Sequence, residues 1–378
     1  MRVVFESHRR QPWTRNSACS TIAALRRDGA SADVSRESMS VITRSKFLIG
    51  AVVATTLALL STACGGGEVR TSGGVPVLRY QGWASQVVIP ELAEDLGFFD
   101  GKVKLEWQGN TISGPQDIQS AATGQVDFGG AFGGAVAKLA QGGAPITAVV
   151  NYYGSDEKTF TGFYVPENSP IRTPKDLLDK KIGVNTLGGQ SEADIHTALK
   201  KAGFNEQQIK SVQLVVLPPP NTEDAVRRGQ VDVAALSGQF QQRAIANGGL
   251  RPVFTDYEEF GPFNGGQYVF RNDFIAKNPD SVRAFVDGVA KAIEWLKTTP
   301  RDQVVAKFTE IIEKRKRSGE DASSVKYWLS VGVPAVNGVI VDADFVRWED
   351  WLRDTGAITG SFEPSKFYTN KYNSQAPK

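Results

Sequence analysis

Five short loops rich in glycine and polar residues are the features of this 378-residue sequence that could bind a charged ligand. Each follows a predicted strand or opens a predicted helix: 81–83 (Gln-Gly-Trp), 113–115 (Ser-Gly-Pro), 130–132 (Gly-Ala-Phe), 188–191 (Gly-Gly-Gln-Ser) and 237–239 (Ser-Gly-Gln). Free backbone N–H groups and the positive end of the helix dipole attract anions at such places. One such loop is ordinary helix capping, whereas five that converge on one cleft would form an anion site.

The elements that must position these loops alternate along the chain. Strands are predicted at 77–81, 103–107, 126–129, 146–152, 181–185, 212–217 and 231–236. Helices are predicted at 85–96, 115–123, 133–141, 191–202, 222–228 and 240–247, with another helix start at 173–176. This alternation is typical of an α/β fold. Ligands in open α/β sheets bind beyond the carboxyl ends of the strands, which is where the loops fall.

One four-residue sequence occurs twice in this pattern. Gly-Gln-Val-Asp stands at 124–127 and again at 229–232. Each copy follows a predicted helix and leads into a strand that ends in small residues. The separation is too long for a solenoid repeat. The match therefore favours two lobes built on one plan.

The C-terminal third has a different pattern. A loop is predicted at 261–266 and an apolar strand at 267–271, followed by a helix that begins at Asn278 and has an apolar stripe. Further helices are predicted at 302–314 and 322–330 and around an aromatic stripe formed by Phe345, Trp348, Trp351 and Leu352. We interpret the stripe as core and the C-terminal helices as packed on lobe 1. The chain is expected to cross between the lobes twice, near 162–166 and 266–271, and two such crossings allow a cleft to close on a ligand.

Residues 41–64 have the pattern of an export signal that ends at a lipidated cysteine. Arg44 and Lys46 form a charged region, and Phe47 to Leu60 form an apolar run, which is short for a membrane span and typical of a signal peptide. The run leads into Leu-Ser-Thr-Ala-Cys64, which resembles a bacterial lipobox, with Ser61 where Leu is commoner. Cys64 is therefore the predicted lipidation site, and acyl chains would hold the protein at the outer face of the cell membrane.

These signals give a predicted domain organisation. Translation is expected to start at Met39, because the residues before it are polar and rich in arginine. The predicted parts are a non-native extension at 1–38, a signal peptide at 39–63, a flexible linker at 64–75, lobe 1 at 76–163 and 268–378, and lobe 2 at 164–267.

Charge and cysteine content exclude several functions. The formal net charge is +2, but residues 1–63 carry nine Lys/Arg and four Asp/Glu, which leaves the remainder at −3. Nucleic-acid binding requires a concentrated basic face, so it is not expected. The basic run 314–317 is interpreted as a solvated helix end. Neither Cys19 nor Cys64 lies in a metal-binding pattern, and no metal or cofactor is predicted.

Several motifs resemble the substrate-binding proteins of nitrate/sulfonate/taurine-type ABC importers. They are Tyr-Gln-Gly at 80–82, Gly-Phe-Phe at 97–99, Val-Asp-Phe-Gly at 126–129, Ser-Pro-Ile-Arg-Thr-Pro-Lys-Asp-Leu at 169–177, Lys-Lys-Ile-Gly-Val at 180–184 and Leu-Pro-Pro at 217–219. The resemblance implies a two-lobed, type II periplasmic-binding-protein fold, no catalysis, an ABC permease with its ATPase as partner, and a monomer. It also implies ligand contacts from Gln81, Trp83, Gly130, Phe132, Gln190, Ser191 and Ser237.

The first choice of ligand is a small aliphatic sulfonate or taurine-like anion. Hydroxyl groups such as that of Ser113 and helix N-termini suit a tetrahedral anion, while Trp83, Phe132 and Tyr152 or Tyr153 would cover an apolar part. The sequence departs from the family at Leu-Ser-Gly-Gln (236–239), where a Trp-Asp-Pro-like segment is common. Nitrate and a neutral pyrimidine-like heterocycle therefore stay as alternatives.

An enzyme and a sensor are the other classes to consider. His196 is interpreted as a plain helical histidine, and Asp256, Glu258 and Glu259 as a solvated turn. The sequence has no serine elbow, P-loop or Cys/His metal spacing. It also lacks the Cys-rich motif on which relatives that make thiamine pyrimidine depend. A binding protein is therefore preferred to an enzyme, and a ligand sensor would require another chain.

Overall fold

The computed structural model describes residues 69–377 of the chain. The predicted extension at 1–38, the signal peptide at 39–63, the lipidation site Cys64 and the first residues of the predicted linker lie outside this part. Within residues 69–377, no helix combines the length and the apolar character that a membrane crossing requires.

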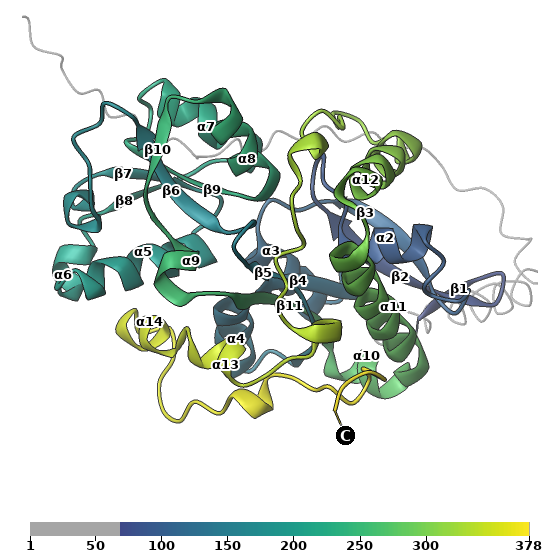
Figure 1. Ribbon diagram of the computed structural model, residues 1–378. Helices are drawn as coiled ribbons and strands as arrows, with labels where there is room; N and C mark the ends of the chain where they lie inside the picture. The colour runs from purple at the N-terminus through teal and green to yellow at the C-terminus, as the bar shows by residue number, and fades with distance from the viewer. Residues whose placement is uncertain (1–68, 378) are drawn as a thin grey trace, which may run out of the picture. The chain divides into compact units, whose positions relative to one another are not determined.

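Lobe 1 contains two three-stranded sheets (Figure 1). The first has the order β1-β2-β3, formed by Arg70–Ser72, Val75–Gly82 and Lys104–Asn110. The second has the order β4-β11-β5, formed by Phe128–Phe132, Phe263–Arg271 and Ile146–Ser155, and is antiparallel. All of β4 and nearly all of β11 are buried, so the second sheet forms the centre of this lobe.

The helices of lobe 1 come from both ends of the described chain. They are α2 (Ile89–Asp95), α3 (Gly114–Ala122), α4 (Gly133–Gln141), α10 (Asn272–Lys277), α11 (Pro279–Thr298), α12 (Arg301–Arg315), α13 (Ala343–Val346) and α14 (Glu349–Asp354). The long helix α11 packs against α2 and β5. Its apolar stripe meets the aromatic cluster around Phe128 and Phe285, whose ring centroids are 4.5 Å apart. The C-terminal helices therefore complete lobe 1, as predicted.

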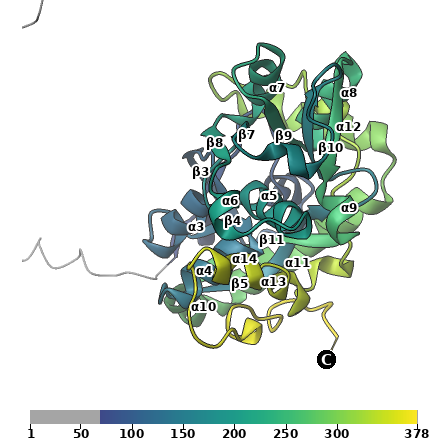
Figure 2. The same cartoon turned by 90° about the vertical axis from the view of Figure 1, so that its left-hand side faces the viewer.

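Lobe 2 contains one five-stranded sheet in the order β10-β6-β9-β7-β8, whose strands are labelled in Figure 1; Figure 2 shows β7, β8, β9 and β10 from another side. Its strands are β10 (Leu250–Thr255), β6 (Thr161–Pro166), β9 (Val233–Ser237), β7 (Lys181–Val184) and β8 (Gln213–Val216). Its helices are α5 (Gln190–Lys201), α6 (Glu206–Ile209), α7 (Pro219–Arg227), α8 (Gly238–Asn247) and α9 (Asp256–Phe260). β7 is parallel to β8 and β9, whereas β6 is antiparallel to β9 and β10. The predicted α/β fold with two lobes is confirmed.

The two crossings between the lobes occur earlier in the chain than predicted. β5 ends at Ser155 and β6 begins at Thr161, so the first crossing is 156–160. The second is 261–262, between the end of α9 and the start of β11. The Phe-Asn-Gly-Gly sequence at 263–266 has the composition of a loop, but it is the first part of β11 and pairs with the end of β5. Tertiary pairing therefore overrides local propensity here.

The repeated Gly-Gln-Val-Asp sequence forms the same structure in both lobes. The glycines, Gly124 and Gly229, have φ values of +77° and +68° and end α3 and α7. The first aspartate, Asp127, donates its N–H to the Arg79 carbonyl and accepts the Arg79 N–H at 2.7 Å. The second, Asp232, makes the same exchange with Lys181, whose N–H it accepts at 2.8 Å. Each repeat thus fastens the segment before a strand to an earlier strand of its lobe, β2 in lobe 1 and β7 in lobe 2, which supports one plan for both.

Two local predictions are wrong. The helix predicted at 322–330 is only a 3₁₀ turn at Val325–Tyr327, which buries Val325 in the core of lobe 1. The helix predicted at 85–96 begins at Ile89, because Ser85 has a left-handed φ of 58° and Pro90 fits the first turn.

The basic run at 314–317 is not simply a solvated helix end. Arg315 and Arg317 have side chains only 10% and 8% exposed, and each pairs with Glu91 at 2.7 Å. Arg317 also lies over the Trp107 ring, 4.5 Å from its centroid. The run therefore anchors the end of α12 to α2 and β3.

Removal of the Phe285 ring tests the core of lobe 1. Phe285 is 0% exposed and contacts several other aromatic rings. We expect Phe285→Ala to lower the free energy of unfolding by about 3–5 kcal/mol, because it removes buried apolar surface and leaves a cavity. Val336→Ala, at a side chain 67% exposed, is the control and should change it by less than about 0.5 kcal/mol. Urea unfolding of both variants measures the difference, and equal effects would contradict this core assignment.

Candidate ligand-binding site

A cavity of about 360 Å³ lies between the two lobes. Lobe 1 contributes Trp83, Phe132 and Tyr152, and lobe 2 contributes Asn185 and Thr186 among others. The first crossing also lines the cavity, through Thr159 and Phe160. A volume of this size is in the range of sites for small organic molecules.

Besides α7, whose first residue Pro219 lines the cavity but has no N–H to donate, four helices of eight or more residues begin at the cavity wall. They are α3 through Gly114, α4 through its N-cap Phe132, α5 through Gly189 and Gln190, and α8 through Ser237 and Gly238. The first turn of a helix carries backbone N–H groups without intrahelical partners and the positive end of the dipole. The helix starts therefore form a positive environment made by the backbone.

The side chains of the cavity wall carry no formal charge. Among its described lining residues there is no Lys, Arg, His, Asp or Glu. Many are aromatic instead: Trp83, Phe132, Tyr152, Tyr153, Phe160, Phe240, Tyr268, Phe308 and Trp328. The site thus combines apolar ring surfaces with backbone donors.

Six of the nine residues predicted from the sequence line this cavity. They are Trp83, Phe132, Tyr152, Gln190, Ser191 and Ser237. The other three do not line it: Ser113 is the N-cap of α3, the Gly130 backbone N–H is bonded to Asp117, and Gln81 lies within β2. Their chain neighbours Gly114 and Ala131 line the cavity in place of Ser113 and Gly130.

The sequence prediction missed residues that approach the cavity from distant parts of the chain. Trp328, Ser330 and Val331 follow the 3₁₀ turn near the C-terminus, and Leu296 and Phe308 belong to α11 and α12. No loop motif marks these positions, so only their apolar character could have suggested burial.

Asp117 is a buried carboxyl group behind the wall. It is 4% exposed, its Oδ2 accepts the Gly130 N–H at 2.7 Å, and its Oδ1 has no partner among residues 69–377. Burial raises the pKa of Asp117 to about 7, although the Gly130 hydrogen bond lowers it. Below that pH the group is neutral, so it adds little negative charge near the cavity.

Asp256 joins the cavity wall to both ends of the first crossing. It is therefore not part of a solvated turn, and that prediction is wrong. It is 1% exposed, and its Oδ1 accepts the Ser155 hydroxyl and the Thr161 N–H, both at 3.0 Å. Its Oδ2 accepts the side-chain amide of Gln190 at 3.0 Å. Gln190 in turn accepts the Tyr153 hydroxyl at 3.0 Å. Burial raises the pKa of Asp256 to about 6, although the hydrogen bonds from Ser155 and Thr161 lower it.

Gln239 forms a second link between the lobes. It lies in the first turn of α8, and its side-chain amide donates to the Ser85 carbonyl at 3.0 Å and to the Ser324 hydroxyl at 2.8 Å. Ser85 adopts a left-handed conformation in the loop after β2. The positive φ of Ser85 is therefore found at a contact between the lobes.

Two α/β lobes with two crossings and a cleft define the fold of periplasmic binding proteins. The periplasmic aliphatic sulphonate binding protein SsuA from Escherichia coli has a TM-score of 0.60 and 21% identity, covering 77% of this chain and 91% of that one. The desulfurization enzyme DSZB also shares the fold, with a TM-score of 0.52 and 16% identity over 78% and 97% of the two chains. Likeness at these identities shows the fold alone.

The chain belongs to the NMT1/THI5-like family, whose model matches residues 91–303. A Brucella abortus (strain 2308) protein, provisionally named a binding protein, is 24% identical over 280 residues, which cover 69% of this chain and 79% of the relative. The family resemblance inferred from the sequence motifs is therefore confirmed.

Replacement of Asp117 tests the buried carboxyl group. Its pKa is raised, so its contribution to stability is present at low pH and is lost as the pH rises through about 7. We expect Asp117→Asn, which keeps an acceptor for Gly130, to gain stability over the wild type by up to about 4 kcal/mol between pH 4 and pH 8. Urea unfolding across this range measures the gain, with the exposed Asp302→Asn as control. A difference that does not change with pH would contradict the assignment.

Proposed function

We propose that this protein is the extracytoplasmic solute-binding component of an ABC importer and that it binds a small organosulfonate, aliphatic or taurine-like, in the interlobe cleft. The observation that carries the proposal is the convergence of four helix N-termini on a cavity that has aromatic walls. The N–H groups suit a tetrahedral anionic group, and the rings suit an apolar tail. The fold of SsuA supports this choice.

The size of the cavity favours an organic anion over nitrate. At about 360 Å³ it would remain largely unfilled by an ion of four atoms. A ligand with a hydrocarbon part would contact Trp83 and Phe132 and remove apolar surface from water.

A neutral heterocycle is the second candidate ligand. The absence of cationic side chains from the described cavity wall favours it over an anion. With no Lys or Arg among the described lining residues, the site has no fixed countercharge for an anion. Flat rings would stack on Trp83 or Tyr152, and Gln190 and Asn185 would supply hydrogen bonds to ring nitrogens.

We propose binding without catalysis. Ser191 and Ser237 line the cavity, but a serine nucleophile requires a neighbouring base. The described wall offers no histidine, lysine or carboxylate for that role. A sensor would bind the same ligand but pass it to no permease, so uptake of the ligand into cells that lack or carry this protein separates the two roles.

We propose that the protein is a monomer with two lobes that follow a signal peptide and a flexible linker. The sequence predicts lobe 1 at 76–163 and 268–378 and lobe 2 at 164–267. We propose the same two lobes with their limits moved to the crossings at 156–160 and 261–262, so that β6 and β11 each stay whole. The partners are an ABC permease and its ATPase, and lipid on Cys64 holds the protein at the membrane.

A pair of variants at Ser237 tests whether the ligand is an anion. Ser237 is the N-cap of α8 and is exposed to the cavity, and Asp and Asn are equally good N-caps. A carboxylate about 5 Å from a bound sulfonate costs about 3 kcal/mol at an intermediate dielectric constant. We expect Ser237→Asp to weaken sulfonate binding at least about tenfold relative to Ser237→Asn.

Calorimetry in a buffer free of sulfonates measures this, with alkanesulfonates, taurine, nitrate, sulfate, pyrimidines and flavins as test compounds. Binding of sulfonates that Ser237→Asp weakens more than Ser237→Asn supports the proposal. Binding of pyrimidines alone, equal in both variants, would replace the sulfonate by the neutral heterocycle. Turnover of a bound compound would overturn the assignment as a binding protein.

Replacement of Cys64 tests the proposed membrane anchor. We expect Cys64→Ser to move the protein from the membrane fraction to the soluble fraction of a bacterial host, because the acyl chains can no longer be attached. Fractionation and the mass of the mature N-terminal peptide measure this, with Ser72→Ala, at an exposed residue after the predicted anchor, as control. A wild-type protein that is soluble and carries no lipid would contradict the anchor.

A further inference from the structure

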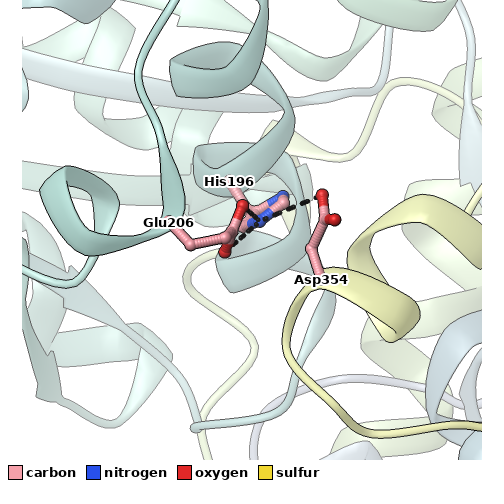
Figure 3. A group of neighbouring side chains, drawn as sticks. All are labelled: His196, Glu206 and Asp354. Carbon is pink, nitrogen blue, oxygen red and sulfur yellow. Dashed lines mark hydrogen bonds and ion pairs between the residues drawn. The ribbon is translucent and has the colours of Figure 1, made fainter.

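A group of metal-binding side chains lies outside the cleft, where α5 and α6 of lobe 2 meet α14 of lobe 1 (Figure 3). It consists of His196, Glu206 and Asp354, whose nearest ligand atoms all lie within 4.8 Å of one another. His196 is 5% exposed, whereas the two carboxylates are partly open to solvent. The histidine is therefore not a plain helical one, since both acidic side chains point toward its ring.

The spacing of these atoms is close to that of a metal site. The His196 Nε2 lies 3.0 Å from each Glu206 carboxylate oxygen and 3.8 Å from Asp354 Oδ2. Neighbouring ligands of a tetrahedral zinc ion are about 3.4 Å apart, because each lies about 2.0–2.2 Å from the metal. The two observed spacings lie on either side of this value, so small side-chain movements would bring all three into coordination.

The same carboxylates already hold a cation. The Lys200 ammonium lies 2.9 Å from Asp354 and 3.4 Å from Glu206. Its side chain is 42% exposed, so it can move away into solvent. This position between two carboxylates and an imidazole nitrogen is thus one in which the protein stabilises positive charge.

We propose that His196, Glu206 and Asp354 bind a zinc ion across the two lobes. One imidazole and two carboxylates are a donor set that zinc accepts, and water would complete the coordination. The ion takes the place of the Lys200 ammonium. Because His196 and Glu206 belong to lobe 2 and Asp354 to lobe 1, the bound ion joins the lobes at a point separate from the cleft.

Zinc binding to matched variants tests the proposal. The full chain carries Cys19→Ala and Cys64→Ala in every sample and no histidine tag, so that thiolates and the tag do not compete. Equilibrium dialysis should give one zinc ion per chain, and cobalt(II) should give the visible absorption of a tetrahedral site. Glu206→Gln and Asp354→Asn should each weaken binding at least about tenfold, the lower end of the effect of even an outer-shell partner. Asp302→Asn, at a side chain 95% exposed, should leave it unchanged.

The lysine provides the sharpest control. Lys200→Gln removes the competing cation, so it should tighten zinc binding, whereas loss of a purely structural ion pair would not. His196→Gln should abolish the cobalt absorption while the circular dichroism stays that of the wild type. Absence of saturable zinc binding, or binding that is equal in the carboxylate variants and the wild type, would overturn the proposal and leave the group as an ion-pair network between the lobes.

Discussion

The described wall of the cleft carries no charged side chain, and the rest of the structure follows from this constraint. A polar ligand that leaves water must recover its hydrogen bonds in the site. Here the donors are backbone N–H groups at the starts of α3, α4, α5 and α8. Backbone donors cannot rotate toward a ligand as a lysine can, so the secondary structure itself must place them. The sheets of both lobes are therefore part of the candidate binding site.

Close approach of the strands makes this placement possible in lobe 1. β11 runs between β4 and β5, and Gly266 stands where a Cβ atom would collide with the Ala131 carbonyl and the Tyr153 ring. At Gly154 a Cβ atom would collide with the Phe263 carbonyl. Without side chains at these points, Tyr153 packs inward and reaches Gln190 of the other lobe. The small residues that read as a loop in the sequence thus bring the aromatic wall and the crossings together.

The sequence predicts best what depends on local patterns. The strand and helix alternation, the bounds of α4 and the two Gly-Gln-Val-Asp turns all follow from periodicity, glycine and capping residues. Local patterns do not predict that some charged side chains are buried, because their burial depends on partners far along the chain. Arg317 is covered by Tyr80 of β2 and Trp107 of β3, and Asp256 is buried between the two ends of the first crossing. Ser113 and Gly130 lie one residue from the cavity wall, which is the accuracy that helix and strand ends allow.

Contacts between the lobes affect ligand affinity, because they change the free energy that a ligand must supply to bring the lobes together. Gln239 bonds to Ser85, Gln190 bonds to Tyr153, and Lys200 pairs with Asp354. These contacts involve no ligand, so they stabilise the observed arrangement of the lobes independently of one. A ligand shifts the balance between open and closed forms only by its difference in affinity for them. Because Gln190 lies in the cleft and also bonds to Asp256, a ligand that contacts it would act on both ends of the first crossing. We therefore expect recognition and closure to be coupled through a side chain that lines the cleft, with no need for a charged residue in its wall.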